Sequence, residues 1–484
     1  MITLREKLIL VFAALIAFGG CLLAGFQFDD YAIFSDASLT SPSGWWEVWR
    51  PLQTRPLTYF TFWANYQLAG QEAFSYHAVN LAIHLACVWV LFDVLKRLMP
   101  ASAAFVATAV FAVHPIQTEA VAYIFARGTL LSTLFCLLAL REWTAGRHWR
   151  TVPWFAAALL AKEECVAFPL FLFLLYLSIS RNTKELQPIG SMLLLSAAAG
   201  LRVVIAAAVT PGSGAGVQAG FTPVQYLATQ GGVILRYFRL LILPWGFTVD
   251  PDISAQPMWW AWLVVLILAS AALWRFPRAQ VGFWFLAGLV LLLPSSSFLP
   301  AADLTADRRM YLPMIAFAGL ATWDRLRFAV PVLIGLSVMQ TQMWTTGEKL
   351  WTQAAERAPN KLRPKIQLAR ALDPARALPI LEQAKSLAPD DPAVASELGR
   401  VYAMSGSPEK ALAQFGRALA LQPNNAQALT NRGVALQLLQ QMDAARQDFE
   451  HALAIDPCLA EARGNAARLG AKLPPCASRH ENAR

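Results

Sequence analysis

Charged residues are scarce in this chain. Only 15% of its 484 residues are Asp, Glu, Lys or Arg, whereas 56% are hydrophobic and 17 are Trp. Soluble domains average about 25% charged residues, and apolar runs long enough to cross a bilayer recur along this sequence. The composition therefore excludes an ordinary soluble enzyme and predicts a polytopic membrane protein.

The sequence also lacks the motifs of several other functional classes. It has no basic segment interleaved with aromatic residues, and basic cytoplasmic loops explain its formal net charge of +9. Its six cysteines show neither a CxxC motif nor a Cys/His metal spacing. Its halves show no matched Gly or Pro breaks of the kind found in transporters. We therefore expect no nucleic-acid binding, no cysteine-based metal centre and no transporter.

No convincing cleavage site follows the first apolar run, residues 8–26, so we expect a retained first span rather than a signal peptide. Arg5 and Lys7 precede this run and place the N-terminus in the cytoplasm by the positive-inside rule. Applied to the later basic clusters, the same rule gives about 11 crossings and leaves everything after Trp344 outside. We expect crossings at 8–26, 77–95, 101–113, 120–140, two short helices between 150 and 181, 187–209, 258–274, 281–293, 310–322 and 328–343.

Three segments need separate interpretations. The two short helices divide at AKEEC, so Lys162 and Glu163 would form a tip below the outer surface in a wet cavity. The glycine-rich stretch TPGSGAGVQAG is expected to be an outer loop. Residues 226–243 carry two arginines, and we interpret them as an interfacial or re-entrant helix.

Two adjacent carboxylates, Asp29 and Asp30, follow the first span at the start of an outer loop, residues 27–76. A carboxylate at the mouth of a membrane cavity can act as a general base or bind a metal, because low dielectric raises its proton affinity. The alternative is a solvated helix end. Which of the two residues would act is left open.

Other polar residues also gather toward the outer side. His77, Asn80 and His84 have the spacing i, i+3, i+7, which puts them on one face of the second span. Any one such residue is most simply a helix cap or a snorkelling side chain. A one-sided collection instead indicates a path for a polar substrate, and its arginines suit a lipid-linked phosphate.

The C-terminal part contains a repeat. Pro389, Pro423 and Pro457 stand 34 residues apart, the period of tetratricopeptide helix pairs. We divide the chain into a membrane domain (1–345), helical repeats (346–473) and a tail (474–484). The repeats could form a rigid spacer or a concave peptide-binding surface. Cys458 and Cys476 would lie in an oxidising compartment, where they could pair.

The membrane part resembles a known family. The motifs RPLT, YHxVNLxxH, HPxxTEAV, KE and RxxYLP follow one another between Arg55 and Pro313. In this order they are similar to the membrane domain of the transmembrane and tetratricopeptide repeat-containing O-mannosyltransferases, which are in the GT-C class. The fold class implied is all-α, a GT-C-type bundle followed by a short solenoid of repeats.

The resemblance implies a reaction and a site. A sugar, mannose or another hexose, passes from a polyprenyl-phosphate donor to a Ser or Thr hydroxyl of an exported protein, with inversion. Asp29 or Asp30 is the implied base, and the departing phosphate is assigned to Arg236, Arg239, Arg308 and Arg309. The residues expected to line the cavity are Arg55, His77, Asn80, His84, His114, Glu119, Arg127, Lys162, Glu163, Asp307 and Tyr311. No metal is required, although a divalent Mg or Mn ion at the aspartates is the alternative.

The sequence departs from the family pattern at two places. Gly128 and Thr129 stand where the family usually has Ala-Asp, and the loop near Pro211 is short. A small bacterial member in the inner membrane, with periplasmic repeats that bind the acceptor protein, accounts for both. The alternatives are transfer to an envelope glycan or lipid, and a non-catalytic membrane-anchored scaffold.

Overall fold

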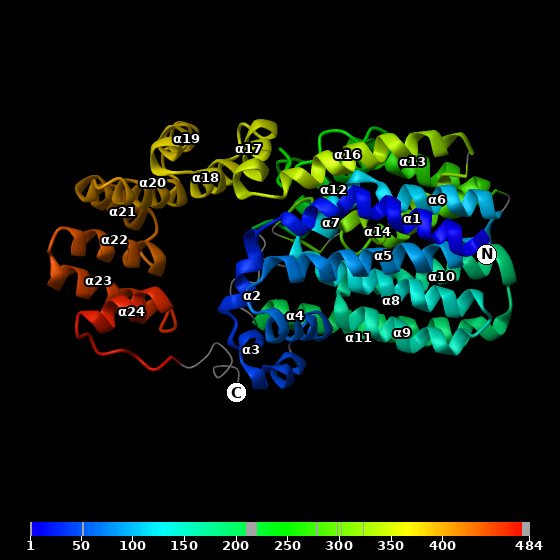
Figure 1. Ribbon diagram of the computed structural model, residues 1–484, viewed down its shortest axis with the longest axis horizontal. Helices are drawn as coiled ribbons and strands as arrows, with labels where there is room; N and C mark the ends of the chain where they lie inside the picture. The colour runs from blue at the N-terminus through cyan, green and yellow to red at the C-terminus, as the bar shows by residue number, and fades with distance from the viewer. Residues whose placement is uncertain are drawn as a thin grey trace. The chain divides into compact units, whose positions relative to one another are not determined.

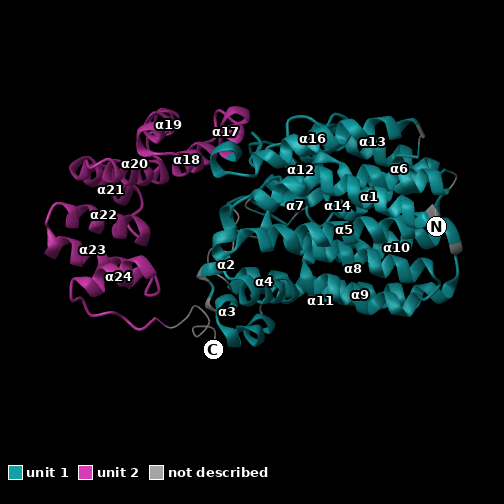
Figure 2. Ribbon diagram, in the orientation of Figure 1, with its two compact units in different colours: residues 1–350 teal, residues 351–484 magenta. Residues whose placement is uncertain are grey.

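The computed structural model describes residues 2–50, 53–209, 220–276, 279–297, 299–301, 303–322 and 324–476. Its regular elements in these ranges are helices. The chain divides into two compact units, residues 1–350 and 351–484 (Figure 2). The all-α fold class is therefore confirmed. Most of the expected glycine-rich outer loop and the last eight residues of the tail lie outside the described residues.

Unit 1 is a bundle whose long helices run side by side (Figure 1). Its α-helices are α1 (Ile2–Phe18), α2 (Ala32–Ser35), α3 (Ala37–Thr40), α4 (Pro56–Ala69), α5 (Ala73–Leu98), α6 (Ala101–Val113), α7 (Thr118–Ala122), α8 (Arg127–Thr144), α9 (His148–Ala161), α10 (Phe168–Leu175), α11 (Leu186–Val209), α12 (Pro223–Ile242), α13 (Trp259–Arg275), α14 (Gln280–Leu292), α15 (Met314–Phe317) and α16 (Val330–Met343).

Several of these helices are suited to a membrane. Among the described residues, five helical stretches are long and apolar enough to cross one, or six if the bent pair α6–α7 is a single span. The helices α13 and α14 are apolar but shorter. The amphipathic α12 is not among these candidates, and its interpretation as an interfacial or re-entrant helix stays a prediction. The total of about 11 crossings stays a prediction.

The break between the two short helices falls where the sequence places it. The helix α9 ends at Ala161, and a 3₁₀ turn, Glu163–Ala167, leads into α10. The NH group of Lys162 still donates to the Ala158 carbonyl, but its backbone is extended. Pro169 follows at the start of α10, where a missing NH group costs nothing. The local sequence therefore ends α9 at Ala161 and begins α10 at Phe168, which leaves the charged residues in the turn between the two helices.

Residues 310–322 do not form the continuous span that we expected. The chain makes a 3₁₀ turn at Asp307–Met310, the four-residue helix α15 and a second 3₁₀ turn, Ala318–Leu320. Pro313 cannot donate a helical hydrogen bond, and a Cβ at Gly319 would lie 2.3 Å from the Trp284 ring. The stretch is apolar because it is buried within unit 1, not because it faces lipid.

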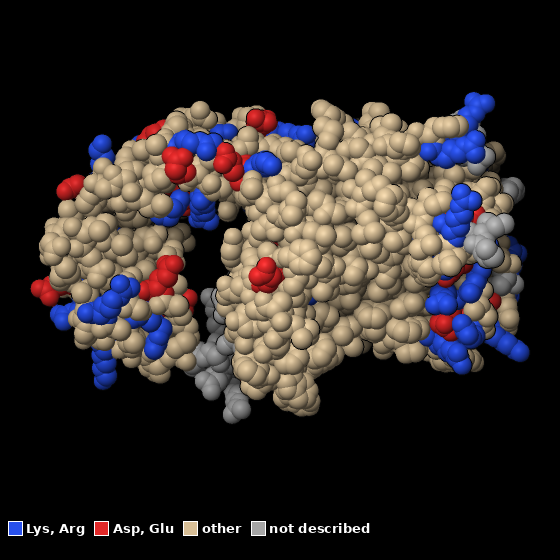
Figure 3. All heavy atoms as spheres, in the orientation of Figure 1, with Lys and Arg blue, Asp and Glu red and all other residues tan. Residues whose placement is uncertain are grey.

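Charge is distributed unevenly over unit 1. On the face shown in Figure 3, its Lys and Arg side chains gather at the end of the bundle that holds the N-terminus, and the flanks between the ends are largely uncharged. This is the distribution that the positive-inside rule describes for a cytoplasmic end.

Unit 2 consists of helix pairs. Its helices are α18 (Leu362–Ala371), α19 (Pro374–Leu387), α20 (Pro392–Met404), α21 (Pro408–Leu421), α22 (Ala426–Leu438), α23 (Met442–Ile455) and α24 (Ala460–Arg468), and α17 (Gly347–Arg357) contains the division between the units. A Cβ at Gly399 would lie 2.7 Å from the Phe415 ring, and one at Gly433 would lie 2.6 Å from the Phe449 ring. Glycine therefore permits the close approach within each pair, as the repeat pattern predicts.

Cys458 and Cys476 form a disulfide that ties the segment after α24 back to the turn before it. Their Cα atoms lie 5.0 Å apart, and 18 residues separate them in sequence. The pairing, which the sequence leaves open, is therefore present in the structure.

Candidate functional site

The acidic pair lies on a 3₁₀ helix, Phe28–Tyr31, directly after α1 and its 3₁₀ extension. Asp30 is fully buried. Its Oδ2 accepts a hydrogen bond from the NH group of Gln27 (2.9 Å), and its Oδ1 accepts one from the NH group of Phe125 (2.8 Å). The Asp30 side chain therefore fixes the first outer loop to the turn that precedes α8.

The environment of Asp30 also changes its protonation. Burial raises the pKa of Asp30 to about 7, and the neighbouring Asp29 carboxylate acts in the same direction. The two backbone hydrogen bonds and the charge of Arg127 oppose this rise. Since both of its oxygens already accept backbone hydrogen bonds, Asp30 is poorly placed to take a proton from a substrate.

Asp29 differs from Asp30 in its exposure and in the number of hydrogen bonds that its carboxylate accepts. It is exposed, and its Oδ2 accepts a hydrogen bond of 2.9 Å from the Tyr123 hydroxyl. Within the described part of the chain, no hydrogen bond to its Oδ1 is present. This leaves an oriented carboxylate with one oxygen open to a hydroxyl donor, which is the arrangement that a general base needs.

Arg127 has no carboxylate partner among the described residues, although it is completely buried. Its guanidinium donates to the side-chain oxygens of Asn80 (2.8 Å) and Asn65 (2.9 Å) and to two backbone carbonyls, and it lies over the Phe62 ring. The Arg127 charge, bound by so many neutral acceptors, joins α4, α5 and α8, and four of the five N–H donors of its guanidinium are occupied within the protein.

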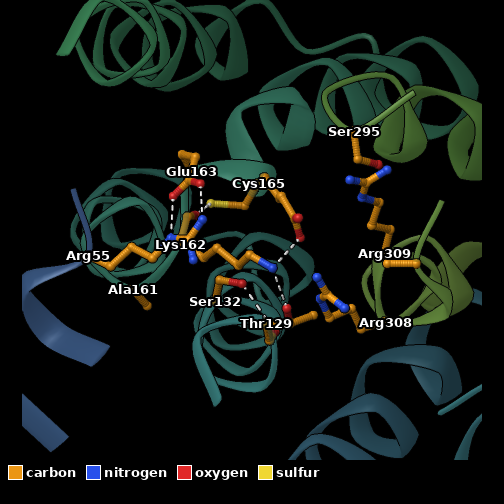
Figure 4. Close-up of polar contacts among 12 residues, drawn as sticks. Arg55, Thr129, Ser132, Ala161, Lys162, Glu163, Cys165, Ser295, Arg308 and Arg309 are labelled. Carbon is orange, nitrogen blue, oxygen red and sulfur yellow. Dashed lines mark hydrogen bonds and ion pairs between the residues drawn. The ribbon is translucent and has the colours of Figure 1, made fainter. Parts of the chain in front are cut away.

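Two cations lie at the break between α9 and α10. Arg55 forms a bidentate ion pair with Glu163, and Lys162 pairs with Glu164 at 2.9 Å. Lys162 also donates to the Thr129 hydroxyl at 2.7 Å. Thr129 therefore holds the lysine at the position where the family usually has an acid. Figure 4 shows Lys162 and Arg308 pointing toward the same region from different elements.

The arginines assigned to the donor phosphate have several different partners. Arg308 pairs with Glu119 and with Asp303 (3.1 Å), and Arg236 pairs with Asp307. Arg309 donates to the Asp303 carbonyl (2.7 Å). Arg239, in contrast, is exposed and donates to the Trp245 carbonyl (3.2 Å).

The histidines and Tyr311 are packed. The Nδ1 of His84 lies 2.7 Å from the Tyr311 hydroxyl, and its Nε2 lies 3.1 Å from the Ala112 carbonyl. The Nδ1 of His114 accepts from the NH group of Ile116 at 3.1 Å, and its Nε2 lies 3.3 Å from the Leu241 carbonyl. His77 is fully buried. These contacts connect helices rather than face a solvent-filled space.

Two cavities flank the Asp29 region. The first is lined by Arg55, Tyr59, Phe125 and Lys162, and the NH group of Phe125 contacts Asp30. The second is lined by Thr118, Glu119, Thr248, Asp307, Gln340 and Trp344. The Trp344 ring centroid lies 5.9 Å from that of Tyr123, whose hydroxyl contacts Asp29. A basic cavity therefore adjoins Phe125, which contacts Asp30, and an acidic cavity adjoins Trp344, whose ring lies near the tyrosine that holds Asp29.

The described residues contain no cluster of three or more His, Cys, Asp or Glu side chains arranged to hold a metal ion. A metal at Asp29 and Asp30 would also have to compete with the two backbone NH groups that occupy Asp30. The residues present therefore do not fit the alternative of a Mg or Mn site at the pair.

Sequence reasoning missed several residues of this region. Tyr123, which orients Asp29, stands two residues after the HPxxTEAV motif, and this closeness to the motif was the available signal. Thr129 was noted only as a departure from the family pattern. Trp344 was noted only as the end of the last span. Arg202 in α11 lies near enough to Glu163 to interact with it electrostatically, and an arginine within an apolar span is itself such a signal.

Comparisons with known proteins confirm the resemblance. Residues 399–440 match the model "TPR repeat", and residues 426–457 match the model "Tetratricopeptide repeat". Protein O-mannosyl-transferase F38B6.6 of Caenorhabditis elegans is 34% identical over 155 residues, which is 28% of this chain and 22% of the relative. Protein O-mannosyl-transferase TMTC3 of Homo sapiens is 31% identical over 166 residues, 30% of this chain and 18% of the relative.

These matches span about a fifth of the length of the curated relatives. Among solved structures, the crystal structure of MamA protein matches with a TM-score of 0.23 and 19% identity, covering 25% of this chain and 69% of that one. The chain is thus similar to membrane protein O-mannosyltransferases and carries tetratricopeptide repeats.

Proposed function

We propose that this protein is a membrane glycosyltransferase that moves a hexose, such as mannose, from a polyprenyl-phosphate donor to a Ser or Thr hydroxyl of an exported protein. The observation that carries the proposal is the oriented, exposed carboxylate of Asp29, in a region that also holds a basic cavity and an acidic one. The names of the relatives and the motifs shared with their family support the reaction class.

The chemistry follows from the charges. The acceptor hydroxyl donates to Asp29 Oδ1 and loses its proton to it as the hydroxyl oxygen forms a bond to the anomeric carbon. The bond from that carbon to the phosphate oxygen breaks, and its electron pair leaves with the lipid phosphate. Because attack and departure occur on opposite faces of the sugar, the configuration inverts.

The departing phosphate needs positive charge. We assign this role to Lys162 and Arg308, which face the same region, with Arg55 and Arg309 beside them (Figure 4). Lys162, Arg308 and Arg55 each form an ion pair with a carboxylate. These cations are therefore held in place before the donor arrives and need little reorganisation. The exposed Arg239 is the weakest of the arginines assigned from the sequence.

The repeats of unit 2 suit the recruitment of the acceptor, because stacked helix pairs present a concave surface to extended segments. The concentration of basic side chains at one end of unit 1 supports a cytoplasmic N-terminus and a site on the opposite, periplasmic side of a bacterial inner membrane.

The test is a mass-spectrometric comparison of exported proteins from cells that lack the gene and cells that carry it. We expect hexose on Ser or Thr of some exported proteins to disappear without the gene and to return with the wild-type protein. It should not return with the Asp29→Asn variant. Hexose restored fully by Asp29→Asn would contradict the proposal and favour a scaffold that recruits another enzyme. If only envelope glycans or lipids change, the acceptor is a glycan or lipid and not a protein.

A further inference from the structure

The second cavity, next to Trp344, has a property that the transfer chemistry does not explain. The hydroxyls of Thr118 and Thr248 line it, and these residues are only 1% and 6% exposed. In the described ranges neither hydroxyl has a hydrogen-bond partner. A buried polar group without a partner is costly, and such groups are rare in folded proteins. Two of them lining one cavity indicate a ligand that supplies the missing hydrogen bonds.

The rest of the lining limits the chemistry of this ligand. Glu119 and Asp307 bring two carboxylates, which accept hydrogen bonds and repel anions. Each pairs with an arginine, Glu119 with Arg308 and Asp307 with Arg236, which fixes the position of both carboxylates. A phosphate would be repelled here, and a hydrocarbon chain would leave the two threonine hydroxyls unsatisfied. The acceptors favour a neutral ligand that carries several hydroxyl donors.

Trp344 adds an apolar wall. It is 2% exposed and lies at the end of α16, and Gln340 on the same helix contributes an amide. A flat aromatic ring beside carboxylate, amide and hydroxyl groups matches a pyranose, which has an apolar C–H face and a rim of hydroxyls. Binding sites of this kind combine an apolar surface with a few fixed polar groups.

One wall of the cavity is not helical. The segment between α12 and α13, which carries Thr248, contains no helix, and Gly246 has φ +88°. The cavity is narrow, so a sugar enters only if this segment shifts outward. The remaining lining comes from Pro115 in the 3₁₀ turn before α7, from α7, from α16 with Trp344 directly after it, and from the turn at Asp307.

We infer that this cavity is the hexose subsite of the protein, with Thr118 and Thr248 as hydrogen-bonding residues and Trp344 as the stacking surface. The inference rests on the proposed function for the source of the sugar, because the hexose would be the one carried by the lipid donor. Its position next to Tyr123 brings the sugar within reach of Asp29.

The inference predicts a combined signature in two variants, Thr118→Val and Thr248→Val, which replace each unpaired hydroxyl with a methyl group of similar size. With the full-length protein in lipid nanodiscs and methyl α-mannoside as the probe, saturation-transfer NMR should show binding weakened about 2- to 10-fold by each variant, the loss of one hydrogen bond. The thermal midpoint of the protein without the probe should not fall, since no hydrogen bond within the protein is removed.

Thr108→Val is the matched control. Thr108 is also buried, but its hydroxyl donates to the Ala104 carbonyl at 2.7 Å. This variant should lower the thermal midpoint and leave methyl α-mannoside binding unchanged. Methyl phosphate and a Ser/Thr-containing peptide, used as further probes, should bind equally well to wild type and to both cavity variants.

Several results would overturn the inference. Methyl α-mannoside binding that is unchanged in both cavity variants excludes a sugar subsite there. Lower thermal midpoints in both variants show that the hydroxyls stabilise the protein itself. Weakened binding of the peptide alone makes the cavity an acceptor site. The binding assay needs no turnover, so a cavity that binds sugar in a protein without transferase activity would sustain the subsite and remove the proposed function.

Discussion

Asp29 and Asp30 are adjacent in sequence but differ in every property that matters for proton transfer. Asp30 is buried with both oxygens occupied, whereas Asp29 is exposed with one oxygen held by Tyr123. We predict that Asp29→Asn lowers glycosyl transfer by about 10²- to 10⁴-fold, the usual contribution of a general base, without changing thermal stability. Initial rates in proteoliposomes check this, and a residual rate close to wild type would remove Asp29 as the base.

Asp30 should instead show its role in stability. Asn can accept through only one oxygen, so Asp30→Asn leaves one buried NH group, that of Gln27 or Phe125, without its acceptor. We predict a loss of about 1–3 kcal/mol in the free energy of unfolding. Thermal unfolding in detergent measures it, and Asp29→Asn is the matched control because its side chain is exposed. Equal stability of the two variants would contradict the assignment.

The pH dependence of the first outer loop gives a separate prediction. Burial raises the pKa of Asp30 to about 7, so the folded loop binds a proton more tightly than the open loop, where the pKa is about 4. The loop should therefore lose stability as the pH rises from about 4 to about 7. Hydrogen exchange of residues 27–31, corrected for the intrinsic rate, should show more opening at pH 7.5 than at pH 5. In Asp30→Asn this difference should vanish, and an opposite slope in wild type would be inconsistent with the buried, protonated Asp30.

The sequence locates the acidic pair but does not distinguish its members. That distinction depends on the NH group of Phe125 and the hydroxyl of Tyr123, which lie more than 90 residues further along the chain. A pattern of local residue types carries no information about such partners. The same reason applies to Arg127, which the sequence places at a helix end but which proves to be buried among neutral acceptors.

At the scale of elements, one ion pair joins the start of α4 to the tip between α9 and α10. Arg55 and Glu163 are partly buried, so their coupling should lie between the roughly 1 kcal/mol of an exposed pair and the about 3–5 kcal/mol lost when a buried pair is broken. We predict that the double variant Arg55→Ala, Glu163→Ala destabilises the protein by less than the sum of the two single variants, because either single change already breaks the pair. A double-mutant cycle of thermal stability measures this coupling, and additive effects would show that the two elements are held by other contacts.

The glycines of the repeats allow another comparison between elements. Gly433→Ala puts a Cβ against the Phe449 ring and should cost about 1–3 kcal/mol, because a packed helix pair resists expansion. Gly416→Ala, on α21, meets nothing within 4 Å and should stabilise its helix by about 0.5–1 kcal/mol. Hydrogen exchange across residues 426–455 in the full-length protein distinguishes the two variants, because only Gly433→Ala should lower protection there. Similar protection in both variants would contradict the close approach of α22 and α23.

Elements were predictable where the sequence carries a local signal. The break at Lys162 follows from charge inside an apolar stretch, and the helix pairs follow from the spacing of Gly, Ala and Phe. Residues 310–322 carry an equally apolar signal but form turns, because apolar composition does not distinguish a lipid-facing helix from a segment buried by its neighbours. Hydropathy therefore predicts that a segment avoids water, but not whether lipid or protein surrounds it.

For the whole molecule, we propose that unit 2 lies on the non-cytoplasmic side, where disulfides form. Cys458 and Cys476 are paired, and the four remaining cysteines, Cys21, Cys87, Cys136 and Cys165, are buried. We predict that a membrane-impermeant maleimide labels intact cells only after mild reduction, and that the double variant Cys458→Ser, Cys476→Ser is not labelled. Labelling that requires lysis of the cells would reverse the orientation.

The most direct measurement of the central claim is transfer by the purified full-length protein in proteoliposomes. The donor is polyprenyl-phosphate mannose, and the acceptor is a peptide from an exported protein that loses hexose when the gene is absent. We expect wild type to form an inverted mannosyl linkage on Ser or Thr, Asp30→Asn to keep measurable activity once folded, and Asp29→Asn to be almost inactive. Transfer by Asp29→Asn at the wild-type rate, or a retained configuration in the product, would contradict the central claim.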